Sequence, residues 1–232
     1  MQFFIIVLIV CLVLFLYRIY HLGNDDYVLI KKNISLEEIF NSVILVSLFS
    51  LLTSRIFYVV LNPLPAFHSP LGFLLFPYFP GLSATGAVVG GAGVLFVYSR
   101  YRKFPIGRIF DFFSISFLFV LPFGFLGYFL LSGEVTVGAL VKLVIFSVIL
   151  FFTNIYLYPK ASALEIKDGT ISMLFMIFFS LVSLLGAAID HPGKNYFLTH
   201  RENFILLAFL ITSVILFLKQ EITGRVTFKN GK

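Results

Sequence analysis

Residues 80–134 read PGLSATGAVVGGAGVLFVYSRYRKFPIGRIFDFFSISFLFVLPFGFLGYFLLSGE, and this stretch decides the fold. It contains two apolar runs, residues 81–98 and 109–131, with a short basic segment at residues 99–108 between them. A helix needs roughly 20 apolar residues to cross a bilayer. The stretch therefore predicts two transmembrane helices joined by a short basic hinge.

The whole chain has the composition of a membrane protein. Of its 232 residues, 59% are hydrophobic and 12% are charged, whereas about 25% of residues are charged in an average soluble protein. Cys11 is the single cysteine and lies in an apolar run, which excludes an intramolecular disulfide and a cysteine-based metal cluster. The spacing of His68, His191 and His200 fits no ligand set. We therefore expect neither a metal nor a cofactor.

The apolar runs predict an all-α integral membrane protein that forms one seven-helix domain over residues 1–232. Ser35 and Glu38 have the spacing of a capping box and mark the start of the second helix. Residues 62–80 hold five of the nine prolines and no Lys or Arg, so we expect an interfacial segment there. The seven predicted spans are residues 2–20, 39–61, 81–98, 109–131, 136–158, 169–188 and 203–218.

The basic residues predict the orientation of these spans. Of the 17 Lys and Arg residues, 13 lie in residues 18–35, 99–108, 159–168 and 219–232, and the alternate loops hold two. Basic loops face the cytoplasm, so the N-terminus is expected outside and the C-terminus in the cytoplasm. The net charge of +6 is therefore explained by topology, and we expect no nucleic-acid partner.

Small residues form a continuous pattern in the third predicted span. Gly86 and Gly90 are four residues apart, the GxxxG spacing that lets a second helix backbone approach closely. One interpretation is helix packing. The other is a cleft that accepts a lipid acyl chain.

Two charged residues near the expected outer face are candidates for a functional role. Arg55 lies about two turns before the end of its span, where it either extends its head group to the interface or binds a phospholipid headgroup. Glu134 lies in the short loop after the fourth predicted span, at the expected outer face. It is either a solvated turn residue or part of a lipid-binding site. Asp111, on the cytoplasmic side, is expected to pair with Arg108 one turn earlier.

Several short motifs follow one another between residues 55 and 134. They are Arg55-Ile56-Phe57-Tyr58-Val59, Gly81-Leu82-Ser83, Gly86, Gly90, Asp111, Gly124, Gly127-Tyr128-Phe129 and Gly133-Glu134. In this order they resemble the prolipoprotein diacylglyceryl transferase family, with weaker support at residues 169–172. The resemblance implies a seven-span bacterial cytoplasmic-membrane enzyme that transfers diacylglyceryl from phosphatidylglycerol to the lipobox cysteine of a prelipoprotein.

The resemblance also defines where this chain departs from the family. Thr85 stands where the family has a histidine, and Phe125 and Tyr128 stand where its signature has arginine and asparagine. Ser183 takes the place of a further arginine. We therefore assign no catalytic residue and expect transferase activity to be weak or lost.

The resemblance implies a phosphatidylglycerol-like lipid as partner, together with a prelipoprotein signal peptide. The alternatives are a non-catalytic lipid-binding membrane protein and a small transporter or assembly factor. The residues expected to contact lipid are Arg55, Ser83, Gly86, Gly124, Gly127 and Glu134.

Overall fold

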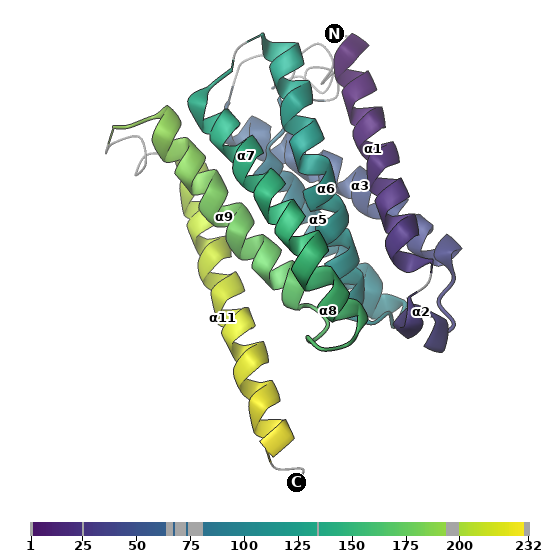
Figure 1. The fold of residues 1–232 in the computed structure, drawn as a ribbon. Helices are drawn as coiled ribbons and strands as arrows, with labels where there is room; N and C mark the ends of the chain where they lie inside the picture. Colours follow the sequence, from purple (N-terminus) through teal and green to yellow (C-terminus); the bar gives the residue numbers. More distant parts are fainter. Residues whose placement is uncertain are drawn as a thin grey trace. The chain divides into compact units, whose positions relative to one another are not determined.

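The computed structural model describes residues 2–24, 26–63, 67, 73, 81–133, 135–193 and 200–229. These residues form helices joined by short turns, and they include no β-strand. The chain divides into two compact units, Met1–Glu134 and Val135–Lys232. Figure 1 follows the helices of each unit along the chain. The all-α class is confirmed, whereas a single domain over the whole chain stays a prediction.

Unit 1 (Met1–Glu134) is built from two pairs of long helices and one short helix. The closest pairs are α3 with α5 and α1 with α6. The predicted capping box is present, since the Ser35 hydroxyl accepts a hydrogen bond from Glu38 N–H at 3.2 Å and the Glu38 carboxylate accepts one from Ser35 N–H at 3.4 Å. The helices are α1 (Gln2–Gly23), α2 (Tyr27–Lys31), α3 (Leu36–Leu61), α5 (Ala84–Tyr101) and α6 (Ile106–Ser132).

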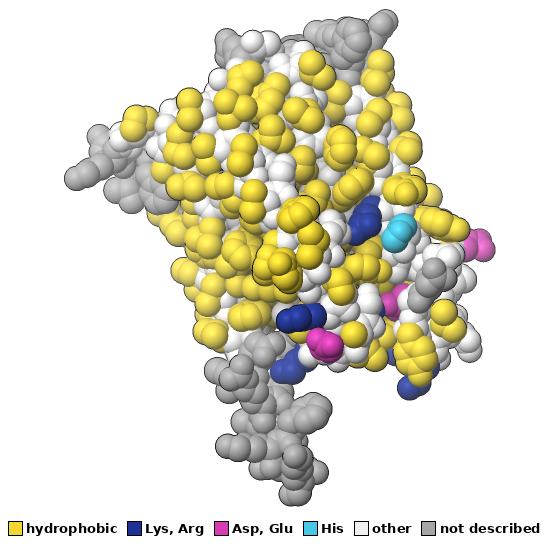
Figure 2. Space-filling view, viewed as in Figure 1, with side chains coloured by type: hydrophobic (Ala, Val, Ile, Leu, Met, Phe, Trp, Pro, Cys, Tyr) yellow, Lys and Arg dark blue, Asp and Glu magenta, His cyan; other side chains and the backbone are white. Residues whose placement is uncertain are grey.

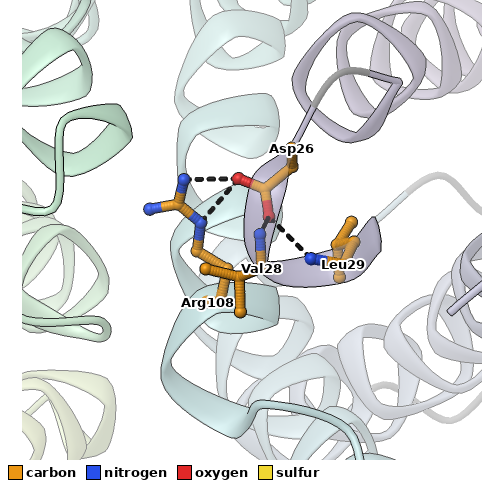
Figure 3. Close-up of polar contacts among 4 residues, drawn as sticks. All are labelled: Asp26, Val28, Leu29 and Arg108. Carbon is orange, nitrogen blue, oxygen red and sulfur yellow. Dashed lines mark hydrogen bonds and ion pairs between the residues drawn. The ribbon is translucent and has the colours of Figure 1, made fainter. Parts of the chain in front are cut away.

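A buried ion pair joins the short helix α2 to α6. Asp26 begins α2, and one of its carboxylate oxygens accepts hydrogen bonds from the backbone N–H groups of Val28 and Leu29 at 3.1 Å each. The other oxygen accepts from Arg108 Nε at 2.9 Å and from Arg108 Nη2 (Figure 3). Arg108 thus pairs with a carboxylate 82 residues away, and its pairing with the nearby Asp111 stays a prediction.

Unit 2 (Val135–Lys232) begins with a helix that is longer than predicted. Helix α7 (Val137–Phe152) passes through a π-helical turn, η2 (Thr153–Leu157), into α8 (Tyr158–Ser162). Pro159 does not end the helix at residue 158, because it lies in the first turn of α8, where a missing N–H is tolerated. The loop predicted at residues 159–168 is shorter accordingly. Helices α9 (Thr170–Asp190) and α11 (Arg201–Lys229) complete the unit.

Helices α7 and α9 approach closely at two glycines. A Cβ atom on Gly138 would lie 2.4 Å from the carbonyl oxygen of Gly186. The carboxylate of Asp190, at the end of α9, accepts hydrogen bonds from Gly138 N–H at 2.8 Å and from the Thr136 hydroxyl at 3.2 Å. An acidic side chain at a helix N-terminus is favourable, so Asp190 ties α9 to the start of α7.

Six helices of the described residues are long and apolar enough to cross a membrane. The seventh predicted span is α5, which is helical but is not among these six candidate spans. The seven-span count and the orientation therefore stay predictions, and most of the segment at residues 62–80 lies outside the described residues. The six candidate spans are Ile5–Gly23, Leu36–Leu61, Ile106–Leu130, Val137–Ser162, Thr170–Asp190 and Arg201–Gln220.

The outward faces of the helices are hydrophobic (Figure 2). Leu130 is 84% exposed and Val97 and Phe151 are each 67% exposed. Such a surface would be costly in water and is favourable against lipid chains. Together with the six spans, it identifies a multi-pass membrane protein.

Candidate functional site

The best-defined candidate site is the junction where the end of α3 meets the start of α5. Two glycines of α5 allow the approach. A Cβ atom on Gly86 would lie 2.6 Å from the Phe57 Cβ and 2.9 Å from the Thr53 carbonyl oxygen, and one on Gly90 would lie 1.9 Å from the Thr53 hydroxyl. The helix-packing interpretation of the GxxxG pattern is therefore confirmed, because this face of α5 is filled by α3.

Ser83 joins the two helices through its backbone and begins α5 through its side chain. Its N–H donates to the Ser54 carbonyl at 3.2 Å, and the Ser54 hydroxyl donates back to the Ser83 carbonyl at 2.8 Å. The Ser83 hydroxyl accepts from Gly86 N–H at 3.1 Å, which makes it the N-cap of the helix. The backbone of Ser83 therefore joins α5 to α3, and its side chain caps α5.

Arg55 lies beside this contact and is buried, with 3% of its surface exposed. Its Nε donates to the Phe73 carbonyl at 3.0 Å and its Nη1 donates to the Gly81 carbonyl at 2.9 Å. The guanidinium also lies 4.9 Å from the centre of the Phe67 ring, within the range of a cation–π interaction. Arg55 thus donates to two carbonyl groups of the chain between α3 and α5. Its roles as an interfacial anchor or as a headgroup ligand stay predictions.

Replacing Arg55 with methionine is expected to lower the stability of the protein by about 1–3 kcal/mol, because two part-buried carbonyl groups lose their donor. Thermal unfolding of the detergent-purified protein measures the change. Arg100→Met is the matched control, since Arg100 is an exposed arginine in the last turn of α5 and surface substitutions change stability by about 0.5 kcal/mol or less. Equal melting temperatures for the two variants would contradict the assigned role.

The remaining predicted lipid contacts lie elsewhere or outside the described residues. Gly127 is buried on α6, where a Cβ atom would lie 2.4 Å from Val7 of α1. A Cβ atom on Gly124 would meet nothing within 4 Å. Glu134 falls outside the described residues. The structure therefore brings Arg55, Ser83 and Gly86 together at the α3–α5 junction and places Gly127 against α1.

The three positions of the missing family residues differ in their surroundings. Thr85 is buried in the first turn of α5, with 3% of its surface exposed. Tyr128 is 49% exposed, and its ring contacts that of Phe129 at a centroid distance of 6.0 Å. Phe125 is half-buried on α6. A threonine hydroxyl and two aromatic rings therefore occupy the positions where the resemblance implies a histidine, an arginine and an asparagine.

Sequence reasoning missed the α3 side of the junction. Ser50, Thr53 and Phe57 contact the glycines of α5, and Ser54 bonds to Ser83. Their spacing of three and four residues places them along one helix face. Small and hydroxyl-bearing residues along one face of an apolar helix are the signal that could have identified this surface.

The chain is a polytopic membrane protein with a polar junction between α3 and α5. Its long apolar helices, the close packing at small residues and the buried Arg55 define this class. The model of the prolipoprotein diacylglyceryl transferase family matches residues 2–139 of the chain. The chain therefore belongs to the prolipoprotein diacylglyceryl transferase family. A comparison with curated proteins found no match. The family match covers unit 1 and ends within the first turn of α7.

Proposed function

We propose that this chain binds a phosphatidylglycerol-like lipid in the bacterial cytoplasmic membrane and that its diacylglyceryl transfer to prelipoproteins is weak or lost. The family match over residues 2–139 carries the proposal. It supplies the class of substrate, while the residues at the expected catalytic positions argue for low activity. The signal peptide of a prelipoprotein is the second partner that this reaction would require.

The chemistry explains why the replaced residues matter. A cysteine thiolate attacks a glyceryl carbon, the carbon–sulfur bond forms, and the carbon–oxygen bond to the departing glycerol phosphate breaks. A general base must accept the thiol proton, and cationic groups must stabilise the leaving phosphate. Thr85 is no base near neutral pH, and Phe125 carries no charge. Loss of a general base alone slows a reaction by about 10²–10⁴-fold.

Arg55 is the residue on which lipid binding is proposed. A guanidinium matches the geometry of a phosphate and stays charged at every physiological pH. Arg55 lies six residues before the end of α3 at Leu61, about two helical turns inside the span. Its two carbonyl contacts orient the guanidinium in unit 1, which would spare the lipid site the cost of ordering a long side chain.

Expression of this chain in cells depleted of an authentic diacylglyceryl transferase is expected not to restore prelipoprotein modification. In a purified assay with phosphatidylglycerol and a lipobox peptide, the rate is expected to be at least about 10²-fold below that of the authentic enzyme, for want of a base. The lipidated peptide is detected by its mass. Full restoration of modification in the depleted cells would overturn the proposal of weak or lost activity.

The lipid part of the proposal is tested separately by the lipids that co-purify with the protein. Arg55→Ala is expected to reduce bound phosphatidylglycerol, and Arg100→Ala serves as the matched control. Undiminished phosphatidylglycerol in a folded Arg55→Ala protein would remove Arg55 from the site.

A further inference from the structure

A second polar feature of unit 1 is a hollow of about 430 Å³ between two loops. One loop follows α2 and contributes Lys32 and Asn33. The other follows α5 and contributes Arg102 and Lys103, with Glu38 of α3 between them. This hollow is lined neither by Arg55 at the α3–α5 junction nor by Thr85, Phe125 or Tyr128.

The two loops have the same construction. Asn33 and Lys103 both adopt left-handed backbone angles, with φ of 52° and 58°. In each case the next N–H turns back to the helix, from Ile34 to the Leu29 carbonyl at 3.0 Å and from Phe104 to the Ser99 carbonyl at 2.8 Å. Such turns close a helix C-terminus. Both helices therefore end at the hollow, with Asn33 and Lys103 presented at equivalent positions.

The hollow carries more positive than negative charge. Arg102 binds the Glu38 carboxylate at 2.6 Å, and that carboxylate also accepts from Ser35 N–H. Lys32 and Lys103 are exposed, and neither makes an ion pair with any residue that the structure describes. Glu38 therefore orients Arg102, while two lysine charges remain for an anion.

The hollow lies where apolar helices begin. The candidate spans starting at Leu36 and Ile106 begin within four residues of Lys32 and Lys103, which would place the hollow at the level of the lipid headgroups. Glu38 and Arg55 are 17 residues apart on α3, about 25 Å along the helix. The hollow is thus at the opposite end of α3 from the α3–α5 junction, on the side that the basic loops assign to the cytoplasm.

We propose that this hollow binds the phosphate group of an anionic phospholipid headgroup or a free phosphate. Lys32 and Lys103 supply the charge, Arg102 supplies oriented donors, and the Asn33 side-chain amide supplies a neutral donor. Basic pockets beside transmembrane helices bind acidic lipid headgroups in this way. The proposal does not rest on the proposed transferase function, because it uses none of the residues at the α3–α5 junction.

The test uses the full chain in nonionic detergent and three probes: phosphatidic acid, phosphatidylcholine with the same acyl chains, and inorganic phosphate. Native mass spectrometry measures lipid binding, and calorimetry measures phosphate binding. We expect phosphatidic acid to bind more tightly than phosphatidylcholine. The double variant Lys32→Gln/Lys103→Gln is expected to weaken its binding about tenfold or more, because two charge-assisted hydrogen bonds are lost.

The double variant Lys31→Gln/Arg100→Gln is the matched control. It also removes two positive charges, but from neighbouring exposed positions that do not line the hollow. We expect less than a twofold change in the affinity for phosphatidic acid. Unchanged melting temperatures show that the exposed variants remain folded.

Selective loss of phosphatidic acid in Lys32→Gln/Lys103→Gln supports a lipid headgroup. If this variant weakens the binding of inorganic phosphate as much as that of phosphatidic acid, the hollow also accepts free phosphate. Equal losses in both double variants, equal affinity for phosphatidylcholine, or unchanged affinity in Lys32→Gln/Lys103→Gln would overturn the proposal.

Discussion

Replacing Asp26 with alanine is expected to destabilise the protein by about 3–5 kcal/mol, the usual cost of removing one partner from a buried ion pair. Asp26 and Arg108 have only 4% of their side-chain surfaces exposed. The substitution takes from Arg108 the carboxylate that it contacts and also removes the acceptor for two N–H groups at the start of α2. Unfolding in a denaturing detergent, followed by circular dichroism, measures the loss.

Two further variants make this prediction specific. Arg102→Ala breaks the exposed pair with Glu38, in which the side chains are 42% and 32% exposed, and we expect a loss of about 1 kcal/mol or less. The double variant Asp26→Leu/Arg108→Met removes both charges of the pair and should be more stable than Asp26→Ala, because neither charge of the pair is then left buried without the other. If Asp26→Ala and Arg102→Ala lowered stability equally, the buried pair would not have the assigned role.

The second large effect is expected at Gly86. In Gly86→Ala the new methyl group would lie 2.9 Å from a backbone oxygen of α3, and a backbone atom cannot move aside as a side-chain end can. We expect a loss of about 1–3 kcal/mol, typical of overpacking. The same detergent unfolding experiment measures it.

Gly93→Ala is the matched control on the same helix. A Cβ atom on Gly93 meets nothing within 4 Å, and alanine is favoured over glycine in a helix by about 0.5–1 kcal/mol. The two substitutions should therefore change stability in opposite directions. A Gly86→Ala protein as stable as Gly93→Ala would mean that α3 and α5 do not pack as described.

Much of the fold was predictable from local sequence patterns. Apolar runs located the helices because a bilayer requires long stretches without charge. The Ser35–Glu38 capping box and the close helix approach at Gly86 and Gly90 were predictable for a similar reason, since both depend on residues three or four positions apart. The continuation of the helix past Pro159 was missed, because proline ends most helices but is tolerated in a first turn.

The candidate site was less predictable, because its contacts join distant parts of the chain. Arg55 was recognised as unusual by its charge within an apolar span, but its acceptors are the backbone carbonyls of Phe73 and Gly81, which no residue type reveals. Asp26 carried no local sign that it would meet Arg108. The family was predicted from motif order and confirmed by the match to residues 2–139, whereas lipid contacts at Gly124, Gly127 and Glu134 stay predictions.

The pairing of Asp26 with Arg108 also has a consequence for the order of assembly during synthesis. Asp26 leaves the ribosome 82 residues before Arg108, so α2, α3 and α5 are made while this carboxylate still lacks Arg108 as its partner. The loop after α1 can become buried only once the first turn of α6 has emerged. The final closure of unit 1 therefore waits for its last helix, and a chain that stops before Arg108 would leave Asp26 in water.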